Sequence, residues 1–202
     1  MRYDRNAIEE AARGWWGSLQ PPVGGEDRRK FPGDRATLAK LRRAGDPLVA
    51  AAEPATIQLY KHLELLPVAA SDAHKGEVLA RVAVLASVLA HVRDDSAQKV
   101  GRALGPAQGA KNGEGGVMTP LRLARLLAAR GDEEIGTAFR RAVALLDDTA
   151  NVGDLAWLIL TWDRDEIGDR TRTLFAFAYH DASAHAPSES TSSADAATTA
   201  NT

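Results

Sequence analysis

The sequence predicts an all-α protein, and three observations lead to that fold class. Alanine, leucine and arginine are plentiful, and these residues favour helices. Aromatic residues make up only 5% of the 202 residues, whereas strands favour aromatic and β-branched side chains. Apolar residues recur at spacings of three and four, and no segment shows a convincing strand pattern or an internal repeat. We therefore expect about eight helices, in one bundle or in two packed halves.

The first half of the chain predicts helices that end at proline or glycine. Periodic apolar residues favour helices over residues 4–19, 35–44, 48–66, 71–92 and 96–104. Asp34 stands where an N-cap is expected, and Pro54 interrupts the third helix. The fourth segment is apolar on nearly all sides, which is typical of a central, buried helix. We expect at least one of Trp15 and Trp16 to pack in the core, and likewise Trp162, rather than to stack on nucleic-acid bases.

The second half begins with a glycine-rich loop over residues 105–116, which we expect to be mobile. Thr119 and Pro120 then fit an N-cap and a first helical position. Further helices are predicted over residues 121–130, 132–146, 151–162 and 169–180. Residues 182–202 are rich in Ser, Thr and Ala and show no periodicity, so we expect a disordered tail. The predicted domain organisation is therefore one helical domain over residues 1–181 followed by this tail.

The sequence lacks the common patterns of catalytic and metal-binding sites. The chain has no cysteine, and none of its five histidines forms a His-x-x-x-His pair. No Gly-x-Ser-x-Gly motif occurs, and Lys111 is followed by Asn112 rather than by the Ser or Thr of a phosphate-binding loop. Asp163, Asp165 and Glu166 are acidic neighbours, but nothing in the sequence positions them as a catalytic pair. We therefore expect no enzyme activity, no metal and no cofactor.

No segment predicts contact with a membrane. The most apolar stretch, residues 78–92, contains Arg81 and His91, and it is shorter than the roughly 20 apolar residues that a membrane span needs. The first five residues, Met1-Arg-Tyr-Asp-Arg, are not followed by the apolar region of a secretory signal. We therefore expect a cytoplasmic protein.

Positive charge is concentrated in two blocks. Residues 28–43 contain seven basic residues and one acid, and residues 99–130 contain six basic residues and one acid. The formal net charge of the chain is only −2, so the remaining segments are acidic. Basic blocks on a near-neutral chain favour an oriented contact with a polyanion. Solvated faces that pair with acids elsewhere in the fold are the alternative.

Arginine is the most informative residue type in these blocks, because its guanidinium can bind phosphate through two parallel hydrogen bonds. Arg122 and Arg125 lie three residues apart on a predicted helix and share a face, whereas the opposite, core side is marked by Leu121, Leu123, Leu126 and Leu127. No base-reading pattern accompanies them, so we expect contact with nucleic-acid backbone, independent of sequence. The candidate nucleic-acid-binding residues are Arg35, Lys40, Arg42, Arg43, Lys99, Arg102, Lys111, Arg122, Arg125, Arg140 and Arg141.

Two other functions remain open from the residues alone. Residues 121–146 form a helix, a glycine turn and a second helix, which is the outline of a helix-turn-helix DNA-binding regulator. The second helix begins with Asp132-Glu133-Glu134, and three carboxylates at that position would repel DNA phosphates. A helical protein-interaction module is the other alternative, in which the arginines pair with acids of a partner.

Seven motifs in a fixed order carry a resemblance to a known family. They are Trp15-Trp16, Asp-Arg-Ala-x-Leu-x-x-Leu-Arg-Arg-Ala over residues 34–44, Gly-Arg-Ala-Leu over 101–104, Pro-Leu-Arg-Leu-x-Arg-Leu-Leu over 120–127, Phe-Arg-Arg-x-Val-x-Leu-Leu over 139–146, Asn151-x-x-Asp154-Leu155 and Leu160-Thr-Trp162. Over roughly residues 8–180 this order resembles the small subunit of the type I-E CRISPR Cascade complex, the CasB family.

The resemblance implies an all-helical, non-catalytic subunit of an antiviral ribonucleoprotein surveillance complex. Members of the family sit as a pair against other Cascade subunits, so those subunits and a second copy of this chain are expected partners. They help to hold crRNA and target DNA and stabilise the R-loop, whose formation is a nearly balanced exchange of duplexes that backbone contacts can tip. The basic residues of the family would correspond to Arg42, Arg43, Arg102, Arg122, Arg125, Arg140 and Arg141.

Overall fold

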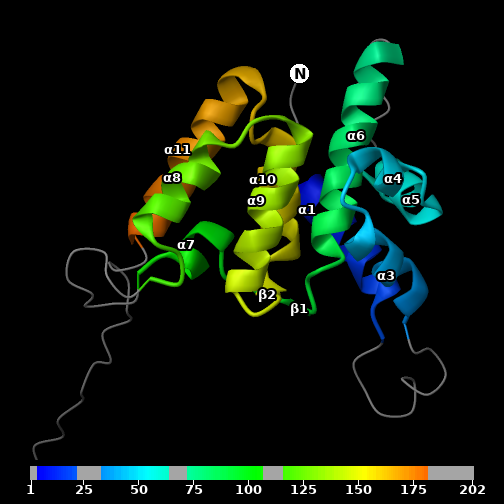
Figure 1. Cartoon of the computed structure of the whole chain (residues 1–202), viewed down its shortest axis with the longest axis horizontal. Helices are drawn as coiled ribbons and strands as arrows, with labels where there is room; N and C mark the ends of the chain where they lie inside the picture. Colours follow the sequence, from blue (N-terminus) through cyan, green and yellow to red (C-terminus); the bar gives the residue numbers. More distant parts are fainter. Residues whose placement is uncertain (1–3, 22–32, 64–71, 107–115, 182–202) are drawn as a thin grey trace, which may run out of the picture.

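Helices form nearly all the regular structure in the computed structural model, which describes residues 4–21, 33–63, 72–106 and 116–181 (Figure 1). These residues contain α1 (Arg5–Leu19), α3 (Arg35–Arg43), α4 (Pro47–Ala51), α5 (Pro54–His62), α6 (Asp72–Leu89), α7 (Val100–Leu104), α8 (Pro120–Ala128), α9 (Gly131–Leu145), α10 (Val152–Thr161) and α11 (Asp165–Asp181). They also contain two short strands, β1 (Asp94–Asp95) and β2 (Thr149–Ala150). The predicted all-α fold class is confirmed.

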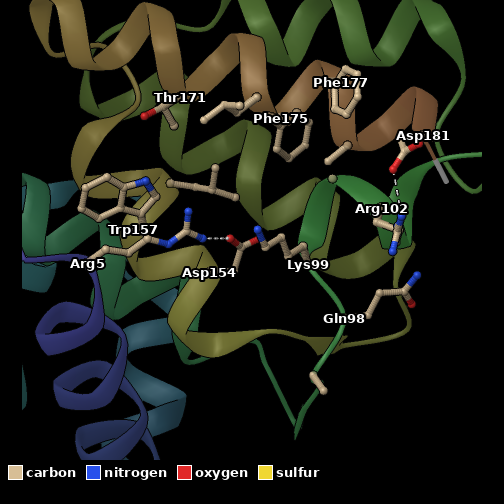
Figure 2. A pocket seen from close by; sticks show the side chains of 15 residues that line it. Arg5, Gln98, Lys99, Arg102, Asp154, Trp157, Thr171, Phe175, Phe177 and Asp181 are labelled. Carbon is tan, nitrogen blue, oxygen red and sulfur yellow. Dashed lines mark hydrogen bonds and ion pairs between the residues drawn. The ribbon is translucent and has the colours of Figure 1, made fainter. Parts of the chain in front are cut away.

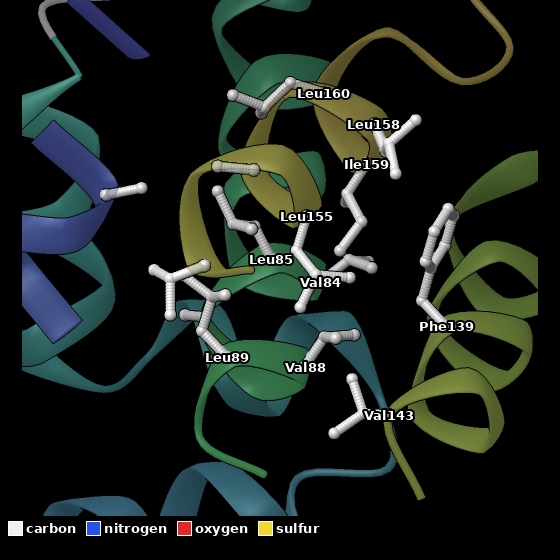
Figure 3. Close-up of a cluster of buried hydrophobic side chains, with 14 of the residues drawn as sticks. Val84, Leu85, Val88, Leu89, Phe139, Val143, Leu155, Leu158, Ile159 and Leu160 are labelled. Atoms are coloured by element: carbon white, nitrogen blue, oxygen red, sulfur yellow. The ribbon is translucent and has the colours of Figure 1, made fainter. Parts of the chain in front are cut away.

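Helix α6 occupies the centre of the core. Val82, Leu85 and Leu89 on this helix are completely buried. Figure 3 shows side chains of α6, α9 and α10 packed together, with Phe139 contributed by α9 and Ile159 by α10. A helix that is apolar on all sides is stable in water only when neighbours cover it, and α4, α5, α9 and α10 all pack against α6. The prediction of a buried central helix is confirmed.

The tryptophans pack as the sequence predicts. Trp15 is buried, and its indole N–H donates to the carbonyl oxygen of Ala55 at 2.9 Å. Trp162 is completely buried, and its ring makes edge-on contacts with Phe139 and Phe175. Trp16 is half-buried. The rings of Trp15 and Trp162 therefore stabilise the core and are not presented to a ligand.

The expected helix starts are capped by side chains. Asp34 accepts from the backbone N–H of Thr37, and Asn151 accepts from the backbone N–H of Asp154. Thr119 accepts from the backbone N–H of Arg122, next to a proline at the first helical position. Each cap satisfies a backbone donor that the helix leaves unpaired, which is why short polar residues mark these boundaries in the sequence.

Two expectations about local structure are wrong. The sequence predicts no strand, whereas β1 and β2 pair in parallel, with Asp94 opposite Thr149. The sequence also predicts a helix from residue 96, whereas α7 begins at Val100. The two differences have one cause, since the backbone N–H of Ser96 donates to Ala150 and extends the paired segment. The carboxylate of Asp154 then accepts from the N–H of Val100, which fixes the helix start there.

Other boundaries shift by a few residues. Pro54 divides the predicted helix over residues 48–66 into α4 and α5, because proline is tolerated at a first helical position but not inside a helix. The last helix starts at Asp165 rather than at residue 169. Lys111, most of the glycine-rich loop and the tail over residues 182–202 lie outside the described residues. Of the described helices, none is both long and apolar enough to cross a membrane.

Candidate nucleic-acid interface

A groove between α8 and α9 brings three of the candidate arginines together. Arg122 and Arg125 come from α8 and Arg141 from α9. The groove has a volume of about 450 Å³, and its apolar lining is contributed by Met118, Leu126, Ala138, Ala144 and Leu145. We call this feature the arginine groove. Arginine guanidinium groups at the rim of a groove are well suited to bind phosphate, because each presents several N–H donors in one plane.

The amphipathic pattern of each helix places these arginines outside the core. On α8, Leu123 and Leu126 are buried, which turns Arg122 and Arg125 toward solvent. The expectation that Leu121 lies on the core side is wrong, because this residue of the first helical turn is 63% exposed. On α9, Phe139 and Val143 are buried, and Arg141 lies between them on the exposed side. The two helices form a hairpin that turns at Gly131, whose φ of 67° lies in the left-handed region that favours glycine. This turn brings the two exposed sides next to each other.

The three arginines of the groove have no acidic partner among the described residues. No carboxylate of the described chain lies within 4.0 Å of Arg122, Arg125 or Arg141. Glu133 and Glu134 lie further along the hairpin, where they line a second hollow that Arg125 and Arg141 share. The guanidinium groups of the groove are therefore available to an external anion.

Arg140 lies apart from its sequence neighbour Arg141. Its guanidinium donates to the hydroxyl of Thr137 at 3.2 Å and lines a small cleft that includes Val84 on α6. Burial lowers the pKa of His91, and the positive charges of Arg42 and Arg140 lower it further. The cleft that Arg140 lines also contains Asp132 and Glu133, and it does not form part of the arginine groove.

The basic residues of α3 lie at the other end of the molecule from α8 (Figure 1). Lys40 pairs with Glu53 at 3.5 Å. Arg42 donates to the carbonyl oxygen of Ala90, where α6 ends, at 2.5 Å. Arg43 donates to a carbonyl oxygen of its own helix, and Arg35 is exposed. Among the described residues, the basic side chains of α3 and those of α8 thus do not form one surface, and part of the α3 set stabilises the fold.

Lys99 and Arg102 belong to a different cavity, between α7, α10 and α11 (Figure 2). Arg102 pairs with Asp181 at 2.9 Å, and Lys99 is exposed. Asp154 lies deeper in the same cavity, where burial raises its pKa, although the N–H of Val100 and the charge of Arg5 oppose that shift. This cavity shares no lining residue with the arginine groove, although α11 packs against α8.

A buried charged cluster that the sequence does not reveal holds the hairpin in place. Arg81 of α6 pairs with Asp132 at 2.6 Å and with Asp163 at 2.8 Å, and Asp163 also accepts from the backbone N–H of Gly131 at 2.9 Å. Burial raises the pKa of Asp163, but the Arg81 guanidinium and this N–H together hold it below its usual value. The only signal in the sequence is a single arginine within an otherwise apolar segment.

The position of this cluster opposes the helix-turn-helix alternative. In that motif the start of the second helix enters the DNA groove. Here the start of α9 carries three acids, and Asp132 is held against α6 by Arg81. Within the described ranges, no three His, Asp or Glu side chains gather as a metal-ligand set. The three arginines of the groove offer several N–H donors of the kind that bind anions.

The fold and the groove define a class of protein, namely a helical protein with a surface cluster of arginines that have no acidic partner in the described part of the chain. The profile of the family described as CRISPR-associated protein Cse2 matches residues 37–180, from α3 to α11. The chain belongs to this family, the small subunits of type I-E CRISPR Cascade. Comparisons with curated proteins and with solved structures found no match. The predicted resemblance is confirmed, and the chain is a structural subunit of Cascade.

Proposed function

We propose that this chain is a non-catalytic Cascade subunit that binds nucleic-acid backbone without sequence preference and so stabilises the R-loop of crRNA and target DNA. The observation that carries the proposal is the arginine groove, in which Arg122, Arg125 and Arg141 converge without an acidic partner among the described residues. Family membership supplies the context, because a Cascade subunit works beside a guide RNA and a DNA target.

The chemistry of the groove favours a backbone contact. Three guanidinium groups of one sign repel each other, and an anion with several negative charges relieves that repulsion. The groove has no amide or carboxylate side chain of the kind that reads adenine or cytosine, and its donors are arginines, which bind phosphate as well as the edge of guanine. Contact of this kind positions a strand and does not identify its sequence.

The remaining candidates take secondary roles in this proposal. Arg35, Arg43 and Arg140 offer additional phosphate contacts on other surfaces of the chain, and Lys111 adds a charge in the glycine-rich loop. Residues 1–181 act as the binding and assembly domain. Other Cascade subunits and a second copy of the chain are the protein partners in the assembled complex.

A salt series on the purified chain and on reconstituted Cascade tests the proposal. Affinity is measured for single-stranded and duplex DNA of two unrelated sequences between about 50 and 200 mM salt. Each phosphate contact on a single strand contributes about −0.7 to the slope of log K against log salt, so three contacts contribute about −2. Replacing Arg122, Arg125 and Arg141 together by alanine should flatten the slope by that amount, equally for both sequences.

A matched control variant distinguishes the loss of phosphate contacts from the loss of net positive charge. The variant with Lys61→Ala, Arg93→Ala and Arg170→Ala removes the same number of positive charges from exposed positions outside the groove. This control should keep nearly the full slope of the parent chain. An unchanged slope in the groove variant, or equal losses in both variants, would show that these arginines do not contact phosphates. Strong preference for one duplex sequence would instead favour a regulator.

A further inference from the structure

The cavity between α7, α10 and α11 is a second concave surface of the chain, with a volume of about 440 Å³ (Figure 2). In Figure 1, α10 and α11 lie behind α9 and α8, so the cavity is built from the layer behind the arginine groove. The two surfaces share no lining residue. A ligand in the cavity would therefore leave the arginine groove open.

One wall of the cavity is apolar and exposed. Leu174 and Phe177 lie one turn apart on α11, with 54% and 68% of their surface exposed. Phe175 between them is buried and packs on Trp162, so the core does not need the two exposed side chains. Trp157 lines the cavity as well, with the Arg5 guanidinium 5.5 Å from its ring centre. Neighbouring exposed apolar side chains at a concave surface are typical of a protein-binding site.

The charges around the cavity are complementary to a carboxylate. Asp154 accepts from Arg5 at 2.7 Å and from the N–H of Val100 at 2.8 Å, and Asp181 is occupied by Arg102. Lys99 is exposed and forms no ion pair within 4.0 Å with a described carboxylate, although its charge lowers the pKa of nearby Asp154. The charge left without a partner at the rim is therefore positive. One lysine beside an apolar wall favours a peptide with a single acid over a polyanion, which needs a row of cations.

We propose that this cavity is a docking site for another protein subunit of Cascade. The segment that binds there carries an aromatic or branched aliphatic side chain that packs against Leu174 and Phe177, and a carboxylate that pairs with Lys99. Lys99 thus serves protein assembly, although its charge alone groups it with the nucleic-acid candidates. The proposal rests on membership of Cascade and does not depend on the arginine groove.

The test uses Cascade of the same CRISPR system, purified without its small subunit and titrated with the full chain. Phe177→Ser should weaken this association at least about tenfold, because a central apolar anchor of an interface contributes more than about 1.4 kcal/mol, which is tenfold in affinity. Leu48→Ser is the matched control, since Leu48 is exposed on α4 at the other end of the molecule. Both variants should melt at the parent temperature.

A charge reversal tests the second contact. Lys99→Glu should also weaken the association, and Lys61→Glu, an exposed lysine on α5, should not. The salt slope for single-stranded DNA on the isolated chain should be the same for Phe177→Ser as for the parent. Because this measurement reports only on DNA binding, the docking proposal and the proposed role of the arginine groove can be refuted independently.

Two results would overturn the docking proposal. Parent-like association of Phe177→Ser with the purified complex would show that the apolar wall is not part of the interface. Self-association of the parent chain that Phe177→Ser abolishes would assign the cavity to a second copy of this chain instead. Sedimentation of the isolated parent and variant chains distinguishes the second result.

Discussion

Arg81→Met is the substitution that most directly tests how the hairpin bearing the arginine groove is held. Arg81 has a side chain that is only 9% exposed, and it joins α6 to Asp132 of α9 and to Asp163, which follows α10. Its guanidinium also donates to the carbonyl oxygen of Ile159 at 3.1 Å. Methionine has a similar length but no donor, so the substitution removes these interactions and leaves two carboxylates without their cation.

The expected loss of stability follows from the burial of the partners. Removing one member of a buried ion pair costs about 3–5 kcal/mol, because the remaining charge is uncompensated. Asp132 and Asp163 retain 31% and 16% exposure of their side chains, so water can solvate them in part. We therefore expect a loss near the lower end, about 3 kcal/mol, which corresponds to roughly 6–12 °C in melting temperature for a chain of this size.

The loss of stability caused by Arg81→Met should become smaller as the pH falls. In the parent, the pKa of Asp163 is lowered, so its contribution to stability is present at neutral pH and is lost only as the pH falls through that lowered value. Without Arg81, burial is the largest influence left and raises the pKa of Asp163. The variant therefore recovers stability relative to the parent as acid protonates this carboxyl group, and the difference between them narrows from about pH 7 toward pH 4.

Chemical denaturation of parent and variant at several pH values measures this difference. Arg93→Met is the control, because Arg93 forms an exposed pair with Asp148, and such pairs contribute at most about 1 kcal/mol. A difference of less than about 1 kcal/mol for Arg81→Met at pH 7, or a difference that grows on acidification, would refute the reasoning.

Two further predictions concern glycine positions and the tail. Gly101→Ala should destabilise the chain by about 1–3 kcal/mol, because a Cβ there would lie 2.9 Å from the carbonyl oxygen of Phe175. Gly76→Ala should stabilise the chain by up to about 1 kcal/mol, because a Cβ at this position of α6 meets no neighbouring atom. Thermal unfolding measures both variants, and equal stability of the two would contradict the close packing at Gly101. Deleting residues 182–202 should leave both the melting temperature and the DNA affinity unchanged, whereas a measurable fall in either would assign the tail a role.

Local signals account for the part of the fold that the sequence predicts. From Val78 onward, helix α6 is apolar on nearly all sides. The caps at Asp34, Thr119 and Asn151 are short polar residues directly before apolar periods. Such features act within a few residues, so they can be read without knowing the rest of the chain. The strands β1 and β2 have two residues each and leave no periodicity to detect.

The candidate site could be predicted only in part, because helix packing decides which exposed residues meet. Arg122 and Arg125 are correctly assigned to one face by their spacing, but nothing in the sequence joins them to Arg141. Adjacent residues of a helix point about 100° apart, so Arg140 and Arg141 take different surroundings despite being neighbours. The partners of Arg81 are 51 and 82 residues away, and no local pattern encodes such a contact.

Stability measurements on the groove variant distinguish a binding role for its arginines from a structural role. An arginine that stabilises the fold has acidic partners, as Arg81 does, and its loss destabilises the chain. The three groove arginines line one groove without such partners among the described residues, so their like charges add repulsion rather than attraction to the folded state. Replacing Arg122, Arg125 and Arg141 by alanine should therefore leave the melting temperature equal or higher while DNA affinity falls. A lower melting temperature would mean that these side chains stabilise the hairpin, and the loss of affinity would then have a structural cause.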